Sequence, residues 1–226
     1  SASPITEVDA LDYNVGVAIE ILNTGAFPAK PEWFHSRLSG SGALPTAIGF
    51  AVGAEQFGSM VQFAGLFAIF GILKHYPLFL NQKNIKNFVI ISFLSTPVLI
   101  PWITTPKPFL LPVAMTSLAF ILVNYLENCR EKKYYLPIFI LISFLLMVAS
   151  TMKLSFLISS FFIGIWALFI SFKKYFLIKS LLIGSLIFTI TILPFQIWKY
   201  INFGGSLFDI ILNPFPGSWP GISQFL

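Results

Sequence analysis

The sequence predicts an all-α protein: a polytopic transmembrane helical bundle with membrane-parallel (juxtamembrane) helices in its first outer loop. Two observations lead to this fold class. Hydrophobic residues make up 56% of the chain and charged residues only 10%, whereas a typical soluble domain has about 25% charged residues. The apolar residues also form long blocks, and several blocks approach the roughly 20 residues that a helix needs to cross a bilayer. The mean hydropathy of +0.83 agrees with this interpretation.

The apolar blocks and the basic residues between them predict the topology. Six blocks are the expected spans: 55–73, 88–104, 109–126, 136–152, 154–172 and 176–195. Nine of the 14 basic residues lie in three short loops, at 74–87, 127–135 and 173–179. Because loops rich in Lys and Arg remain in the cytoplasm, we expect the other polar segments on the outer side. These are residues 1–54, the turns at 104–108 and 151–154, and the tail from 196.

This topology divides the chain into three parts. We expect an outer loop with an interfacial amphipathic helix at 1–54, a transmembrane region of about six helices at 55–195, and a truncated outer loop at 196–226. The chain begins with Ser and shows no leader, so we expect it to be the N-terminal portion of a longer membrane protein. The expected location is the bacterial inner (plasma) membrane, with residues 1–54 on the periplasmic or extracellular side.

Acidic residues gather in the first segment, which holds four of the nine acids of the chain: Glu7, Asp9, Asp12 and Glu20. Apolar residues recur there every three or four positions, which predicts an amphipathic helix along the membrane surface. The Asn-Thr-Gly sequence at 23–25 is expected to end it. These acids have two interpretations. They form a solvated face of the helix, or Asp9 and Asp12 take part in acid–base chemistry. The second is open because two carboxylates one turn apart repel each other, and a raised pKa on one of them would suit that role.

The spacing Asp9-x-x-x-Tyr13, followed by an apolar run and a glycine-containing turn, resembles a known first outer loop. It is similar to that of the polyprenyl-phosphate-dependent glycosyltransferases of the GT-C superfamily, which include aminoarabinose and mannosyl transferases. Asp9 and Tyr13 fall on the acid and the tyrosine that begin a membrane-parallel helix in those enzymes. Asp12 stands where many relatives have arginine, which leaves open which Asp acts. The segments PEWFHSRLSGSG, TTPKP and STMKLSFL resemble other outer loops of such enzymes.

The resemblance implies an integral membrane glycosyltransferase that works with inversion at the outer face. It would transfer a sugar from a polyprenyl-phosphate donor to a lipid-linked, glycan or protein acceptor. Asp9 is the expected general base on the acceptor hydroxyl, with Asp12 in support. Cations and polar groups are expected around the donor phosphate. The candidates for substrate and phosphate binding are Tyr13, His35, Arg37, Lys107 and Lys153.

Several basic residues on the outer side have two interpretations. Lys107 stands between two prolines and so outside any regular helix, which favours a role toward phosphate. Lys153, between two apolar blocks, either faces a cavity or extends to the interface. Lys199 has an aromatic residue on each side, which is typical of an interfacial anchor.

Metal sites are less well supported. His35 and His75, the two histidines, are expected on opposite sides of the membrane, so we predict no histidine metal site. The spacing of the acids does not call for a cofactor, although Asp9 and a lipid phosphate together would offer oxygen ligands to a divalent cation.

Other function classes fit less well. The net charge of +5 does not indicate nucleic acid as a partner, because the basic residues form short clusters beside apolar blocks. A single cysteine, Cys129, excludes an internal disulfide, and the chain has no glycine-rich phosphate loop, HExxH or GxSxG motif. The alternatives are a polysaccharide or lipid transporter, flippase or ligase-like protein, or an accessory scaffold. Because the spans carry almost no ionisable residues, an ion-coupled carrier is disfavoured.

Overall fold

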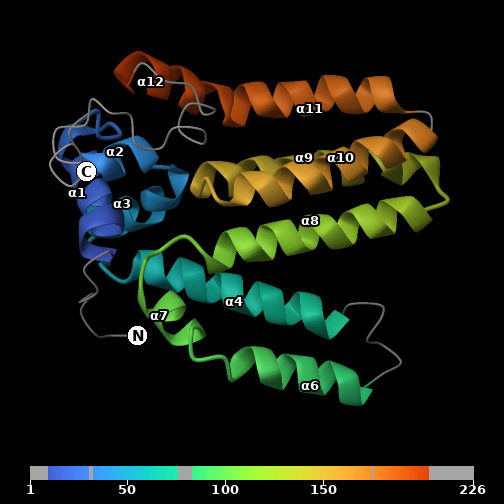
Figure 1. Ribbon diagram of the computed structural model, residues 1–226, viewed down its shortest axis with the longest axis horizontal. Coiled ribbons are helices and arrows are strands. Elements are labelled where there is room, and N and C mark those ends of the chain that lie inside the picture. Colours follow the sequence, from blue (N-terminus) through green and yellow to red (C-terminus); the bar gives the residue numbers. More distant parts are fainter. Residues whose placement is uncertain (1–9, 31–32, 76–82, 175, 204–226) are drawn as a thin grey trace, which may run out of the picture.

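Figure 1 shows the computed structural model, which describes residues 10–30, 33–75, 83–174 and 176–203. All regular structure in these residues is helical, as the sequence predicts. The longest helices are α4 (Phe57–His75), α8 (Leu110–Asn128), α9 (Tyr135–Met152), α10 (Phe156–Lys173) and α11 (Leu177–Thr191). They run side by side, with α9 in contact with α8, α10 and α11, and with α4 packed on α8. The largest buried apolar cluster lies between α8, α9 and α10.

The shorter helices occupy the ends and one flank of this bundle. They are η1 (Ala10–Val15), α1 (Gly16–Thr24), α2 (Phe34–Leu38), η2 (Ser41–Ala43), α3 (Leu44–Ala51), α6 (Lys83–Leu94), α7 (Leu99–Thr104), η3 (Lys132–Tyr134) and α12 (Leu193–Phe203). Helices α1, α2 and α3 gather at one end, where α7 and α12 also lie (Figure 1). We call this the N-helix end.

The opposite end of the bundle carries the connections from α8 to α9 and from α10 to α11 (Figure 1). We call it the basic end, because it holds Arg130, Lys132, Lys133, Lys173 and Lys174. The acid-bearing first segment and these two lysine-rich connections therefore lie at opposite ends of the long helices, which is the arrangement that the sequence predicts.

Among the described residues, four helices are long and apolar enough to cross a membrane, at Phe57–Lys74, Leu110–Asn128, Lys132–Met152 and Phe156–Lys173. They match four of the six expected spans. A fifth crossing results if α11 and α12, whose axes meet at 44°, count as one broken span. The break follows from Pro194 in the first turn of α12, since proline supplies no N–H to continue the ladder of α11.

The span expected at 88–104 is corrected by the structure, because α6 and α7 divide it into two short helices. Helix α6 ends where Ser95 and Thr96 turn their hydroxyls back onto the carbonyl oxygens of Ile91 and Ser92, at 2.8 and 3.0 Å. Pro97 follows directly and disfavours helical geometry in the residue before it. Sequence hydropathy did not detect this interruption.

The predicted amphipathic helix is present as η1 followed by α1. It ends at Gly25, whose φ of +70° is a left-handed conformation that glycine adopts without strain. Val17 and Ala18 are fully buried, and α1 packs on α3. Leu11 and Leu22 of the predicted apolar stripe remain exposed. The helix therefore buries one side against protein and leaves apolar side chains for a membrane surface.

A buried polar side chain of α4 binds the backbone at the start of helix α8. Gln62, only 1% exposed, accepts hydrogen bonds through Oε1 from the backbone N–H groups of Phe109 and Leu111, at 3.0 and 3.3 Å. These are N–H groups that a helix start leaves without intrahelical partners. Gln62 thus fixes the turn at 104–108 against α4.

Candidate functional site

Tyr13 and His35, both predicted to contact substrate, lie together at the N-helix end. Their rings stack with 4.9 Å between centroids and 21° between planes. The Tyr13 hydroxyl donates a hydrogen bond to the carbonyl oxygen of Leu38 at 3.0 Å. Burial raises the pKa of Tyr13 to about 12, so the phenol is protonated at neutral pH. Tyr13 therefore ties η1 to the end of α2 and holds one face of His35.

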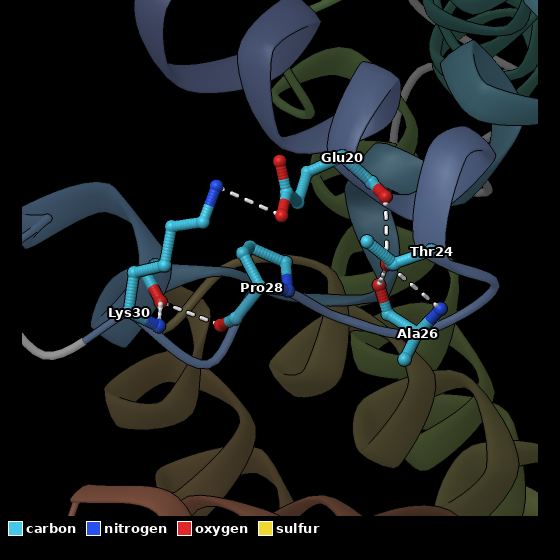
Figure 2. A network of polar contacts seen from close by, with 6 residues as sticks. Glu20, Thr24, Ala26, Pro28 and Lys30 are labelled. Atoms are coloured by element: carbon cyan, nitrogen blue, oxygen red, sulfur yellow. Dashed lines mark hydrogen bonds and ion pairs between the residues drawn. The ribbon is translucent and has the colours of Figure 1, made fainter.

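The chain between α1 and α2 is fixed by the polar contacts of Figure 2. Lys30 Nζ pairs with Glu20 Oε1 at 2.8 Å, and Thr24 Oγ1 donates to the carbonyl oxygen of Glu20 at 2.8 Å. Ser36 Oγ accepts the Lys30 N–H at 3.0 Å and donates to the carbonyl oxygen of Pro28. The charge of Glu20 is thus matched within this segment, and α2 is anchored to α1.

Arg37, near the end of α2, and Lys199 of α12 are both buried cations. Arg37 is 9% exposed, and its Nε has no hydrogen-bond partner within the described residues. Lys199 is 5% exposed. Leu38 and Lys199 line one cavity of about 30 Å³, enough for about one or two water-sized groups. Two buried like charges are unfavourable unless an anion joins them.

Lys107 and Lys153 form a second pair of cations from two different turns. Lys153 Nζ lies 3.1 Å from the centroid of the Phe109 ring, and Phe109 stacks on Trp102 at 5.2 Å. Burial, and then the positive charge of Lys107, lower the pKa of Lys153 to about 8. Lys153 is therefore partly buried against the Phe109 ring, and the choice between its two interpretations stays a prediction.

The segments that carry these cations meet at the last turn of α9. Ser41 Oγ and Thr151 Oγ1 lie 2.9 Å apart, and Thr151 lines the cavity that contains Lys199. A Cβ atom on Gly40 would lie 2.5 Å from the carbonyl oxygen of Thr151, and one on Gly42 would lie 2.6 Å from Pro108 Cβ. Only glycine permits this approach. The segment at 39–42 therefore bridges the end of α9 and the Lys107 turn.

The side chains of the two predicted catalytic carboxylates, Asp9 and Asp12, are not among those that the structure describes. Asp9 lies outside the described residues. Asp12 belongs to η1, next to Tyr13, and its side chain is also outside the described part of the structure. Among the described residues, no group of three or more His, Cys, Asp or Glu side chains is placed to hold a metal ion.

Sequence reasoning missed Lys199 as a member of this site. Its aromatic neighbours suggested an anchor in the interface, but Phe27 packs on Phe195 and Trp198 and covers that side of α12. The usable signal was Pro194, which marks a break in the helix and so turns α12 toward the N-helix end.

Comparison with known proteins identifies the family. A model described as the DUF1420 N-terminal domain matches residues 1–226, and the chain belongs to this family. No curated protein and no solved structure matches the chain.

Proposed function

We propose that this member of the DUF1420 family is an integral membrane glycosyltransferase. It transfers a sugar from a polyprenyl-phosphate donor to a lipid-linked, glycan or protein acceptor at the outer face of the membrane. One observation carries the proposal: the segments that contain four cations, Arg37, Lys107, Lys153 and Lys199, meet at the last turn of α9. Such a cluster fits a phosphate group, which charge-assisted hydrogen bonds from Lys and Arg hold strongly.

The proposed reaction is a single displacement at the anomeric carbon. The acceptor hydroxyl oxygen forms the new glycosidic bond while the bond from the anomeric carbon to the phosphate oxygen breaks. The electron pair of that bond leaves with the polyprenyl phosphate, and the cations neutralise the negative charge that develops there. Asp9 takes the proton of the acceptor hydroxyl as general base, and Asp12 is the alternative base. Attack opposite the leaving group inverts the anomeric configuration.

The test is sugar transfer by the full-length protein in isolated membranes. The donors are radiolabelled mannose and glucose, each linked to a polyprenyl phosphate. Asp9→Asn is expected to lower transfer by about a hundredfold or more, because loss of a general base costs that much. Lys132→Gln at the basic end is the matched control and should retain wild-type transfer, since its side chain is exposed far from α1–α3. Full transfer by both Asp9→Asn and Asp12→Asn would overturn the assignment.

A transporter or flippase is the second candidate, and the broken pair α11 and α12 favours it. Discontinuous helices often build the substrate sites of secondary transporters. The same membranes decide between the two: a transporter moves the labelled lipid across sealed vesicles without forming a glycosidic product. Movement without product would replace the transferase by the transporter.

A further inference from the structure

Helices α9, α10 and α11 enclose an apolar groove of about 550 Å³. Phe139, Leu146, Phe161 and Phe188 contribute large side chains to its lining. At Gly184 the lining is open: a Cβ atom there would meet no atom within 4 Å. Because the groove lies between membrane-spanning segments, hydrocarbon rather than water is the medium that fills it.

The groove continues into the cavity that Lys199 lines together with Leu38, the residue after Arg37. Ser150, Leu157 and Ile192 line both of them. Moving from the groove toward the N-helix end, the lining changes from aromatic and aliphatic groups to Ser39, Gln196 and the buried Lys199. The two spaces therefore form one path with an apolar part and a cationic end.

We propose that this path binds one phosphate-bearing lipid, with its phosphate between Arg37 and Lys199 and its hydrocarbon chain in the groove between α9, α10 and α11. The choice of a polyprenyl chain rests on the proposed function, whereas the lipid site itself does not require sugar transfer.

Charge and shape both exclude simpler occupants. A lipid without an anionic group would leave Arg37 and Lys199 buried without a counter-ion from the described residues. A soluble phosphate would satisfy the cations but would make no use of the groove. A phosphate lipid matches both parts, because one or two of its phosphate oxygens reach Lys199 in the small cavity while its chain buries apolar surface in the groove.

The experiment measures binding to the purified full-length protein in detergent by native mass spectrometry. Three compounds are titrated: undecaprenyl phosphate, the phosphate-free alcohol undecaprenol, and inorganic phosphate. We expect undecaprenyl phosphate to bind at least tenfold more tightly than either of the others. Lys199→Met and Arg37→Met, which remove a charge and keep an unbranched chain, should each weaken undecaprenyl phosphate about tenfold or more. Lys30→Met, which removes a partly exposed charge from the same segment, should leave its binding unchanged.

The groove is tested by filling it. Gly184→Phe places a ring in open space, so we expect a folded protein that binds undecaprenyl phosphate at least tenfold more weakly and inorganic phosphate as the wild type does. Gly71→Phe is the matched control: its added Cβ also meets no atom within 4 Å, and it lines a different apolar hollow, between α4 and α8. The proposal would be overturned if Gly71→Phe weakened the binding of undecaprenyl phosphate and Gly184→Phe did not. It would also be overturned if the wild-type protein bound undecaprenol or inorganic phosphate as tightly as undecaprenyl phosphate.

The binding experiment can succeed or fail independently of the proposed sugar transfer. Tight binding that Lys199→Met and Gly184→Phe both weaken establishes the lipid site even where no sugar is transferred. Transfer that survives both substitutions contradicts the lipid site and leaves the transferase in place.

Discussion

The positive charges at the two ends of the helical bundle have different surroundings. At the basic end, Lys174 Nζ donates a hydrogen bond to the carbonyl oxygen of Cys129 at 2.5 Å, and Lys133 pairs with Glu131 at 2.7 Å. At the N-helix end, Arg37 and Lys199 are both buried, and neither has an acidic partner among the described residues. The basic end has charges that are exposed or satisfied locally, which is what a topology signal requires. Buried charges without partners instead indicate a site for an anion.

The largest expected effect comes from removing one charge at each end. Arg37→Met should lower sugar transfer about a hundredfold, because a buried contact to the phosphate is lost. The same variant should be at least as stable as the wild type without lipid, since the repulsion of Lys199 is relieved. Lys174→Met should behave in the opposite way, losing about 1.5–3 kcal/mol of stability with its hydrogen bond and keeping transfer.

These effects are measured by transfer in membranes and by thermal unfolding in detergent. The comparison fails if Arg37→Met destabilises the lipid-free protein as much as Lys174→Met does. That result would mean that Arg37 is satisfied inside the folded chain.

The next effect concerns how the N-helix end is attached to α9. Gly42→Ala places a Cβ atom 2.6 Å from Pro108 Cβ and 2.7 Å from the carbonyl oxygen of Met152, so the segment at 39–42 must move away. Overpacking of this kind costs about 1–3 kcal/mol. Gly71→Ala in α4 meets no atom within 4 Å and should stabilise its helix by about 0.5–1 kcal/mol.

Unfolding of both glycine variants is followed in detergent, together with sugar transfer. Gly42→Ala should lose transfer as well as stability, because the segment at 39–42, which follows Arg37 and α2, is displaced from α9. A Gly42→Ala protein with wild-type stability would show that the contact to Pro108 yields freely.

The comparison of the two ends also explains what the sequence could predict. The long helices follow from the bilayer, which imposes length and apolarity on each span, so α8, α9 and α10 were found within two residues at each boundary. The separation of the basic connections from the first segment follows from one topological rule. The end of α1 at Gly25 follows from turn chemistry at a single residue.

The site was predicted less completely, since it depends on contacts between distant segments. Tyr13 and His35 were both named, but their stacking joins residues that no local pattern connects. Arg37 and Lys199 are separated by most of the chain, and the bend between α11 and α12 that sets the direction of the helix of Lys199 is not visible in any local pattern around Arg37. The interruption of the expected span at 88–104 depends on hydroxyl groups that hydropathy counts as nearly neutral.

The smallest expected effect is a pH dependence that separates the Lys107–Lys153 pair from the lysines of the basic end. Burial and the charge of Lys107 hold the pKa of Lys153 at about 8, below its usual value of 10.5. Only the protonated ammonium attracts phosphate, so its contribution is present below about pH 8 and is lost as the pH rises through that value. Transfer should therefore fall several-fold between about pH 7 and pH 9, whereas Lys153→Met should start lower and lack this inflection. A wild-type profile without an inflection near pH 8, or one that Lys153→Met retains, would remove Lys153 from the phosphate site while leaving Arg37 and Lys199 untouched.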